Sequence, residues 1–112
     1  MEIKKGHVYI ADLNPHRGTE PGKIRPVVVV QTDLLNGFHP STIVCPITTH
    51  VSPKTELLRV HLATGEGGIK EPSDILVDQI RAIDNRRFVK RAGSISPRHL
   101  KRLVENIRIL LG

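Results

Sequence analysis

Three polar residues of this sequence stand where an apolar stretch meets a loop. Arg25 precedes the run "PVVVV", Thr48 ends the stretch "TIVCPIT", and Asp78 follows "DILV". Side chains at strand ends can converge on one site because rigid strands hold them. A guanidinium offers a planar, permanently charged fork for phosphate oxygens, a hydroxyl donates one hydrogen bond, and a carboxylate accepts a proton or holds an arginine. Taken singly, each of these residues is more often a solvated strand end than part of a site.

Other kinds of site find little support in the sequence. The six histidines form no metal-binding spacing, and no GxxxxGK[ST] or GxSxG motif occurs. The single cysteine, Cys45, lies in an apolar run and is typical of a small buried hydrophobe in a reducing compartment. We therefore expect no metal, no cofactor and no membrane span, and a cytoplasmic protein.

The positive charge of the chain is concentrated near its C-terminal end. The net charge is +6 over 112 residues, and residues 81–108 carry nine basic against two acidic residues, a net charge of +7. Such a field suits a polyanion or an acidic protein as partner. A solvated helix face is the alternative interpretation of the same charges.

The elements that must position these residues are short strands followed by one helix. Hydrophobic patterns predict strands at residues 7–13, 26–32, 42–48, 57–62, 74–83 and 91–95. Pro46 predicts a sheet edge or a bulge. Ser96 and Pro97 open an amphipathic helix that runs to the end of the chain. The pattern favours one mainly β domain over residues 1–112, a small curled antiparallel barrel with a C-terminal helix.

Four ordered motifs make the sequence recognisable as a whole. These are "KKGHVYIADLNPHRGTEPGKIRPVVVVQTD", "VCPITT", "VDQIRAID" and "GSIS" before the terminal helix. Together they resemble the MazF/PemK family of bacterial toxins, the mRNA interferases, over nearly the whole chain. The resemblance implies an SH3-like barrel with a terminal helix and a homodimer. It also implies metal-independent cleavage of single-stranded RNA at a short sequence, and an acidic antitoxin as partner.

The resemblance also assigns roles to residues. The family's recurrent catalytic arginine and threonine fall on Arg25 and Thr48, and its Asp-Gln-x-Arg motif begins at Asp78. Some members carry an arginine where this chain has Leu76 and a histidine where it has Thr19, so this chain cannot use those side chains for proton transfer. With only three aromatic residues, base reading must rest on loop hydrogen bonds. The candidate RNA-contacting residues are His16, Arg17, Glu20, Lys23, Thr49, Lys54, Gln79 and Arg81.

The expected reaction is attack of the 2′-OH on the adjacent phosphate, which gives a 2′,3′-cyclic phosphate or 3′-phosphate and a 5′-OH end. Arg25 and Thr48 would stabilise the phosphoryl oxygens, and Asp78 would accept the proton or hold Arg25 or Arg81. Two other classes remain open. One is a non-enzymatic toxin of the CcdB type that poisons gyrase, and the other is an inactive binding module. The polar set and the intact "RPVVVV" and "PIT" motifs argue against both.

Overall fold

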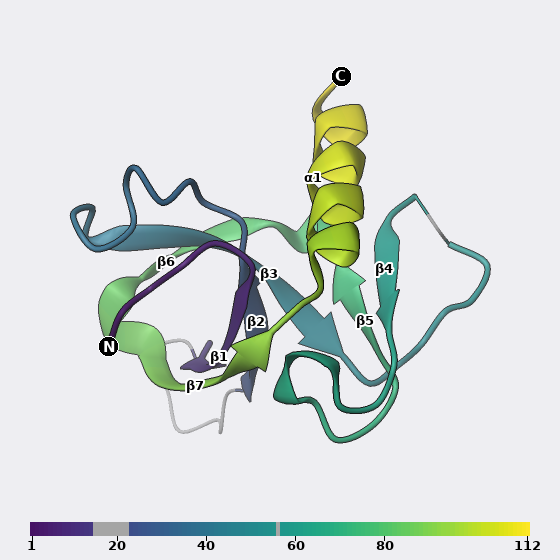
Figure 1. The fold of residues 1–112 in the computed structure, drawn as a ribbon, viewed down its shortest axis with the longest axis horizontal. Coiled ribbons are helices and arrows are strands. Elements are labelled where there is room, and N and C mark those ends of the chain that lie inside the picture. The colour runs from purple at the N-terminus through teal and green to yellow at the C-terminus, as the bar shows by residue number, and fades with distance from the viewer. Residues whose placement is uncertain (15–22, 56) are drawn as a thin grey trace.

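The computed structural model describes residues 1–14, 23–55 and 57–112 (Figure 1). Its strands are β1 (His7–Asp12), β2 (Ile24–Val29), β3 (Ser41–Thr48), β4 (Arg59–Leu62), β5 (Ser73–Leu76), β6 (Arg81–Asp84) and β7 (Phe88–Ser94). Short 3₁₀ turns cover Glu66–Gly68, Val77–Gln79 and Asn85–Arg87, and α1 spans Pro97–Leu111. The expected fold class, a mostly antiparallel sheet with a C-terminal helix, is confirmed.

The strands form one antiparallel sheet in the order β4-β5-β3-β2-β1-β7, and β6 pairs with β3 off this path. One edge of β3 serves two partners. Its residues 41–44 pair with β6, and its residues 47–48 pair with β5. Pro46 pairs with Val27 on β2, and on the other edge of β3 it lies between these two segments. The predicted sheet edge is wrong, because β3 is a central strand with partners on both sides.

The prediction of one strand over residues 74–83 is wrong. Ile75 pairs with Ile47 and Arg81 with Val44, so six residues of chain separate two positions whose partners are three residues apart. The chain takes up the excess in the Val77–Gln79 turn, where Asp78 and Gln79 are exposed. The predicted single strand is therefore two short strands, β5 and β6, with a turn between them.

Two apolar clusters lie on opposite faces of the sheet, which explains the unbroken valines of β2. The first cluster, under α1, includes Val28, Cys45, Ile47 and Leu103. The second cluster contains Tyr9, Ala11, Val27, Val29, Val44 and Ile83. Because successive residues of a strand face opposite ways, Val28 belongs to the first cluster and Val27 and Val29 to the second, all three fully buried. Strand β2 is therefore buried on both faces at these three residues.

Helix α1 begins as its sequence predicts. The Ser96 hydroxyl oxygen accepts the backbone N–H of His99 at 3.1 Å, and Pro97 occupies the first turn. Leu103 is fully buried against the first cluster, while Leu111 is 75% exposed because the last turn projects beyond the strands (Figure 1). Across the described ranges, no helix has both the length and the apolar character needed to cross a membrane.

Candidate active site

Arg25 lies inside β2, which begins two residues earlier than the sequence predicted. It pairs with Ala11 on β1 and is half-buried. On the other side, the β2–β3 ladder pairs Val27 with Pro46 and Val29 with Val44. Continuing this register by two residues brings Arg25 opposite Thr48. Directly opposed residues point to the same face of a sheet, so the two predicted catalytic side chains share one face.

The same line of residues continues beyond Thr48. On β5, Asp74 pairs with Thr48, and on β4, His61 pairs with Asp74. We call Arg25, Thr48, Asp74 and His61 the cross-strand row. The row lies on the face of the sheet that carries the second apolar cluster. Its strand neighbours Val60, Leu62 and Ile75 belong to the first cluster, and neighbouring residues of a strand face opposite sides. A polar line thus runs across β3, β5 and β4, and the continued register of β2 adds Arg25 to it.

Asp74 is the most heavily bonded member of the row. Its side chain is fully buried. Its Oδ2 accepts the backbone N–H of Ser52 at 2.8 Å and the Arg59 guanidinium at 3.1 Å, and its Oδ1 lies 2.5 Å from Nδ1 of His61. Burial acts to raise the pKa of Asp74, but the hydrogen bonds from Ser52, His61 and Arg59 outweigh it and hold the pKa below its ordinary value.

Asp74 and Arg59 also fix the turn that follows Thr48. Arg59 donates to the carbonyl oxygen of His50 at 2.5 Å, and the Thr48 hydroxyl oxygen accepts the backbone N–H of His50 at 3.2 Å. With the Ser52 bond to Asp74, these contacts tie residues 48–52 to β4 and β5. The orientation of the Thr48 hydroxyl therefore depends on a buried carboxylate that is not one of the predicted site residues.

The first prediction concerns Asp74 and pH. A carboxylate whose pKa is lower in the folded state than its unfolded value of 3.8 contributes stability above that value, and the contribution is lost as the pH falls through the folded pKa. We expect Asp74→Asn to lower the free energy of unfolding by about 2 kcal/mol at neutral pH, and the gap to narrow below about pH 4. Urea titrations of both proteins at pH 7, 5 and 3 measure the difference between their free energies of unfolding. The same difference at all three pH values would contradict the prediction.

The other predicted site residues are not part of the row. Asp78, Gln79 and Arg81 are exposed, as are Lys23, Thr49 and Lys54. Among the described residues, Asp78 makes no hydrogen bond or ion pair with Arg25 or Arg81, so the predicted hold on either arginine is not seen. Burial, and then the nearby charge of Asp78, raise the pKa of Cys45 to about 12, in keeping with the expected inert thiol. His16, Arg17 and Glu20 lie outside the described residues.

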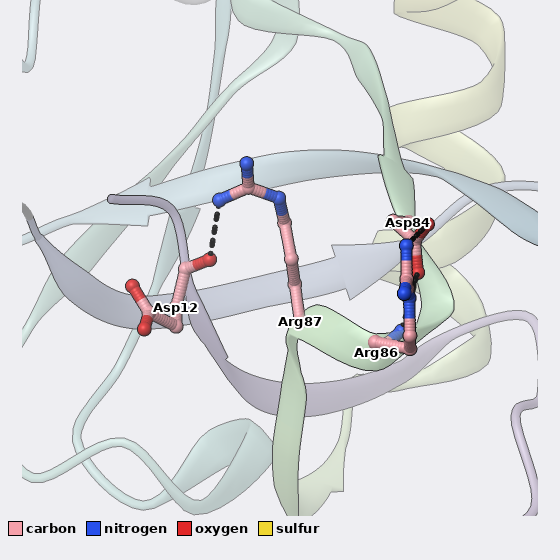
Figure 2. Close-up of a pocket in the computed structure, with 4 residues that line it drawn as sticks. All are labelled: Asp12, Asp84, Arg86 and Arg87. Atoms are coloured by element: carbon pink, nitrogen blue, oxygen red, sulfur yellow. Dashed lines mark hydrogen bonds and ion pairs between the residues drawn. The ribbon is translucent and has the colours of Figure 1, made fainter. Parts of the chain in front are cut away.

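A separate hollow of about 450 Å³ is lined by Asp12, Asp84, Arg86 and Arg87 (Figure 2). Arg87 reaches across to β1 and donates to the carbonyl oxygens of Asp12 at 3.0 Å and Asn14 at 2.7 Å. Arg86 instead folds back on Asp84, and its hydrogen bonds lower the pKa of that carboxyl to about 2. Arg87 thereby holds the end of β1 beside the start of β7.

Sequence reasoning did not find Arg59, His61 and Asp74. The alternation in "LLRVHL" does place Arg59 and His61 on one polar face, and Asp74 is the second residue of the next strand, β5. This local pattern does not reveal that β4 pairs with β5 and that β5 pairs with β3. Those two pairings bring Asp74 between His61 and Thr48.

Comparison with known proteins identifies the group to which this architecture belongs. A profile described as "PemK-like, MazF-like toxin of type II toxin-antitoxin system" matches residues 4–111. The chain belongs to this PemK/MazF family. It is 35% identical over 111 residues to endoribonuclease EndoA of Bacillus subtilis, an alignment that covers 99% of this chain and 96% of that protein.

Further relatives agree with this family. Endoribonuclease MazF of Staphylococcus saprophyticus is 34% identical over 110 residues, which is 98% of this chain and 92% of that protein. A crystal structure of MazE-MazF from Deinococcus radiodurans superposes with a TM-score of 0.84 at 24% identity, covering 100% of this chain and 97% of that chain. The fold described above is thus the fold of MazF structures.

Proposed function

We propose that this PemK/MazF chain is an endoribonuclease that cleaves single-stranded RNA at a specific short sequence, through attack of the 2′-OH. The observation that supports the proposal is the register of β2 and β3, which would set Arg25 and Thr48 on the same face if it is continued two residues beyond Val27 and Pro46. Family membership supports it, since two relatives of more than 30% identity are named endoribonucleases.

The geometry suits charge that develops on a phosphoryl group. A guanidinium matches two phosphoryl oxygens with parallel donors and stays charged at every working pH. Arg25 sits in a strand whose next residues are packed on both faces, so little reorganisation accompanies the reaction. Such preorganised donors are commonly the largest single contribution to catalysis. Thr48 adds one hydroxyl donor from the neighbouring strand.

The remaining RNA contacts are proposed from exposure and charge. Lys23, Lys54 and Arg81 are exposed cations that suit phosphates, and Thr49 and Gln79 are exposed hydrogen-bonding groups that suit bases. We extend the proposal to His16, Arg17 and Glu20 from the family resemblance alone. Asp78, exposed and outside the cross-strand row, is proposed as a substrate-facing carboxylate.

A second copy and an acidic antitoxin complete the proposal. The family is one of type II toxin–antitoxin systems, which supports an inhibitor protein. Helix α1 offers a matching surface, a hollow of about 370 Å³. Its lining combines apolar Pro97, Leu100 and Val104 with three cations and one carboxylate: Lys5, Lys101, Arg108 and Glu105. An amphipathic acidic segment fits such a surface in both polarity and charge. For the homodimer, exposed Leu34 and Phe38 offer apolar area.

The test is cleavage of a long single-stranded RNA in EDTA, with the ends of the fragments mapped. We expect cutting at a short recurrent sequence, 2′,3′-cyclic phosphate or 3′-phosphate ends, and 5′-OH ends. Strict dependence on a divalent metal, or 3′-OH and 5′-phosphate ends, would contradict the 2′-OH route. In the same assay, the protein encoded beside this chain should abolish cutting, with faster association at low salt.

A further inference from the structure

A hollow of about 300 Å³ lies on the face of the sheet that carries the first apolar cluster. Part of its lining is apolar: Ile10 and Pro26 are paired across β1 and β2, and Ile69 and Ala92 pack with the first cluster. We call it the strand-end hollow. Ligand pockets of about 300–1,000 Å³ commonly combine apolar walls with a few polar groups, so one at the lower end of this range suits a single small ring system.

The strand-end hollow begins one residue away from each of the two proposed catalytic residues. Its lining residue Pro26 directly follows Arg25 on β2. Its lining residue Thr49 is exposed and directly follows Thr48, the last residue of β3. Consecutive Cα atoms are about 3.8 Å apart. A nucleotide whose phosphate lies between Arg25 and Thr48 therefore has the hollow within reach of an adjoining base, across the end of β3.

Polar groups complete the lining of the hollow. Lys70 and Glu71 are exposed, and within the described part of the chain their side chains make no hydrogen bond or ion pair. The Ser73 hydroxyl donates to the carbonyl oxygen of Glu71 at 2.9 Å, which fixes the backbone of this wall. A nucleobase has apolar faces, and its edges carry donors and acceptors. The ammonium suits a carbonyl oxygen of a base, and the carboxylate suits an amino or ring N–H group.

The connection between β4 and β5, which carries these charges, is held against β7 and α1 (Figure 1). The Glu66 carboxylate accepts the backbone N–H of Ser96 at 3.1 Å and lies 2.6 Å from Nδ1 of His99. The turn lies so close to β7 that a Cβ at Gly93 would stand 2.6 Å from the backbone carbon of Gly67. This wall of the hollow is thus preorganised, which lowers the cost of ordering it when a ligand binds.

We propose that the strand-end hollow is a base-binding subsite, which takes a nucleobase next to the cleaved phosphate, and that Lys70 and Glu71 read the edge of that base. The inference rests on the proposed function. Single-stranded RNA can turn a base out of its stack into a pocket, where hydrogen bonds read its edge. No aromatic residue is found among the described residues that line the hollow, so apolar side chains hold the faces of the base in place of a stacking ring.

The first experiment is single-turnover cleavage of an RNA oligonucleotide that contains the mapped site, with each nucleotide in turn replaced by an abasic ribonucleotide. Ile10→Phe puts a larger side chain into the hollow at a half-buried position. We expect it to slow cleavage of the intact oligonucleotide by about 10- to 100-fold. At one position flanking the cut, loss of the base should slow the wild type but cause no further loss in Ile10→Phe. At every other position the two proteins should lose equally, because separate contacts act additively.

The second experiment tests how the edge is read, by sequencing the ends cut from a random RNA pool. Glu71→Gln and Lys70→Met each remove one charge from an exposed side chain. We expect discrimination at that same flanking position to fall by about tenfold or more, with the other positions unchanged. Glu2→Gln is the matched control. Its exposed carboxylate pairs only with Lys4 among the residues described, so its loss should leave the preferences as they are.

Several results would overturn the inference. One is an equal abasic penalty in the wild type and Ile10→Phe at every position, and another is the absence of a wild-type penalty at both positions flanking the cut. Unchanged preferences in both Glu71→Gln and Lys70→Met would remove the edge contacts. An Ile10→Phe protein that cuts normally but resists the antitoxin would show a subsite for the inhibitor instead.

A second variant guards against a folding defect. If urea titration shows that Ile10→Phe is not folded, Thr49→Phe, at an exposed position of the same lining, is measured under the same criteria. The wild type separates the two levels of the argument. Cleavage by the wild type upholds the proposed function whatever the variants do, whereas a wild type that cuts no RNA removes the proposed function and the subsite together.

Discussion

Replacing Arg25 by alanine is expected to slow cleavage of single-stranded RNA by about 10²–10³-fold without changing the fold. The guanidinium is half-buried, and within the described residues it makes no hydrogen bond or ion pair. Removing it therefore leaves no protein partner unsatisfied, and the loss falls on the transition state rather than on stability. Single-turnover rates, with urea titration as the check on folding, measure both quantities.

The Arg25→Lys protein tests geometry separately from charge. An ammonium keeps the positive charge but cannot make two parallel hydrogen bonds to one phosphoryl group, so we expect it to be nearly as slow as the alanine variant. Arg86→Ala is the matched control, because Arg86 is an exposed arginine that pairs only with Asp84 among the residues described and its loss should leave the rate unchanged. Near-normal turnover by Arg25→Lys would show that charge alone suffices.

Gly68→Ala is expected to be the most destabilising of these substitutions, by about 3 kcal/mol or more. Gly68 has φ +76°, in the left-handed region, and a Cβ there would lie 2.1 Å from the backbone oxygen of Ala92 on β7. Backbone atoms of a paired strand cannot move aside cheaply. The glycine turn at 66–68 can therefore lie against β7 only without a side chain at this position.

Gly65→Ala separates the cost of a left-handed φ from the cost of a clash with β7. Gly65 also has a left-handed φ, +96°, but its Cβ would meet nothing within 4 Å. We expect it to cost only the left-handed penalty, about 1 kcal/mol. Urea denaturation of the two variants beside the wild type gives the difference directly. Equal losses would show that the close approach of the turn to β7 is not what makes Gly68 necessary.

The parts of the fold that local chemistry dictates could be predicted from the sequence. The Ser96 cap, the following proline and the helical stripe define α1, and four consecutive valines define a strand buried on both faces. Arg25 and Thr48 could be singled out because each borders such a strand. Both predictions need only neighbouring residues and the period of the chain.

The features that could not be predicted depend on pairings between segments that are distant in the sequence. Asp74 has no local sign of its importance, because its partners Ser52, Arg59 and His61 come from other parts of the chain and meet it through the β3–β5–β4 ladders. The break between β5 and β6 has the same origin. Both strands use one edge of β3, and the sequence from 74 to 83 does not reveal that the edge is shared.

Because of that shared edge, the proposed site lies where β3 changes from one pairing partner to another. Thr48 belongs to the part of β3 that pairs with β5, whereas Arg25 belongs to β2, which pairs with β1 and with the preceding residues of β3. The separation of the two side chains therefore depends on the course of a single strand through Pro46. A proline ring fixes φ at this position and removes one of the rotations by which the strand could flex. The stiffness of one residue in the backbone of β3 thus limits how far the two halves of the proposed phosphate site can move apart.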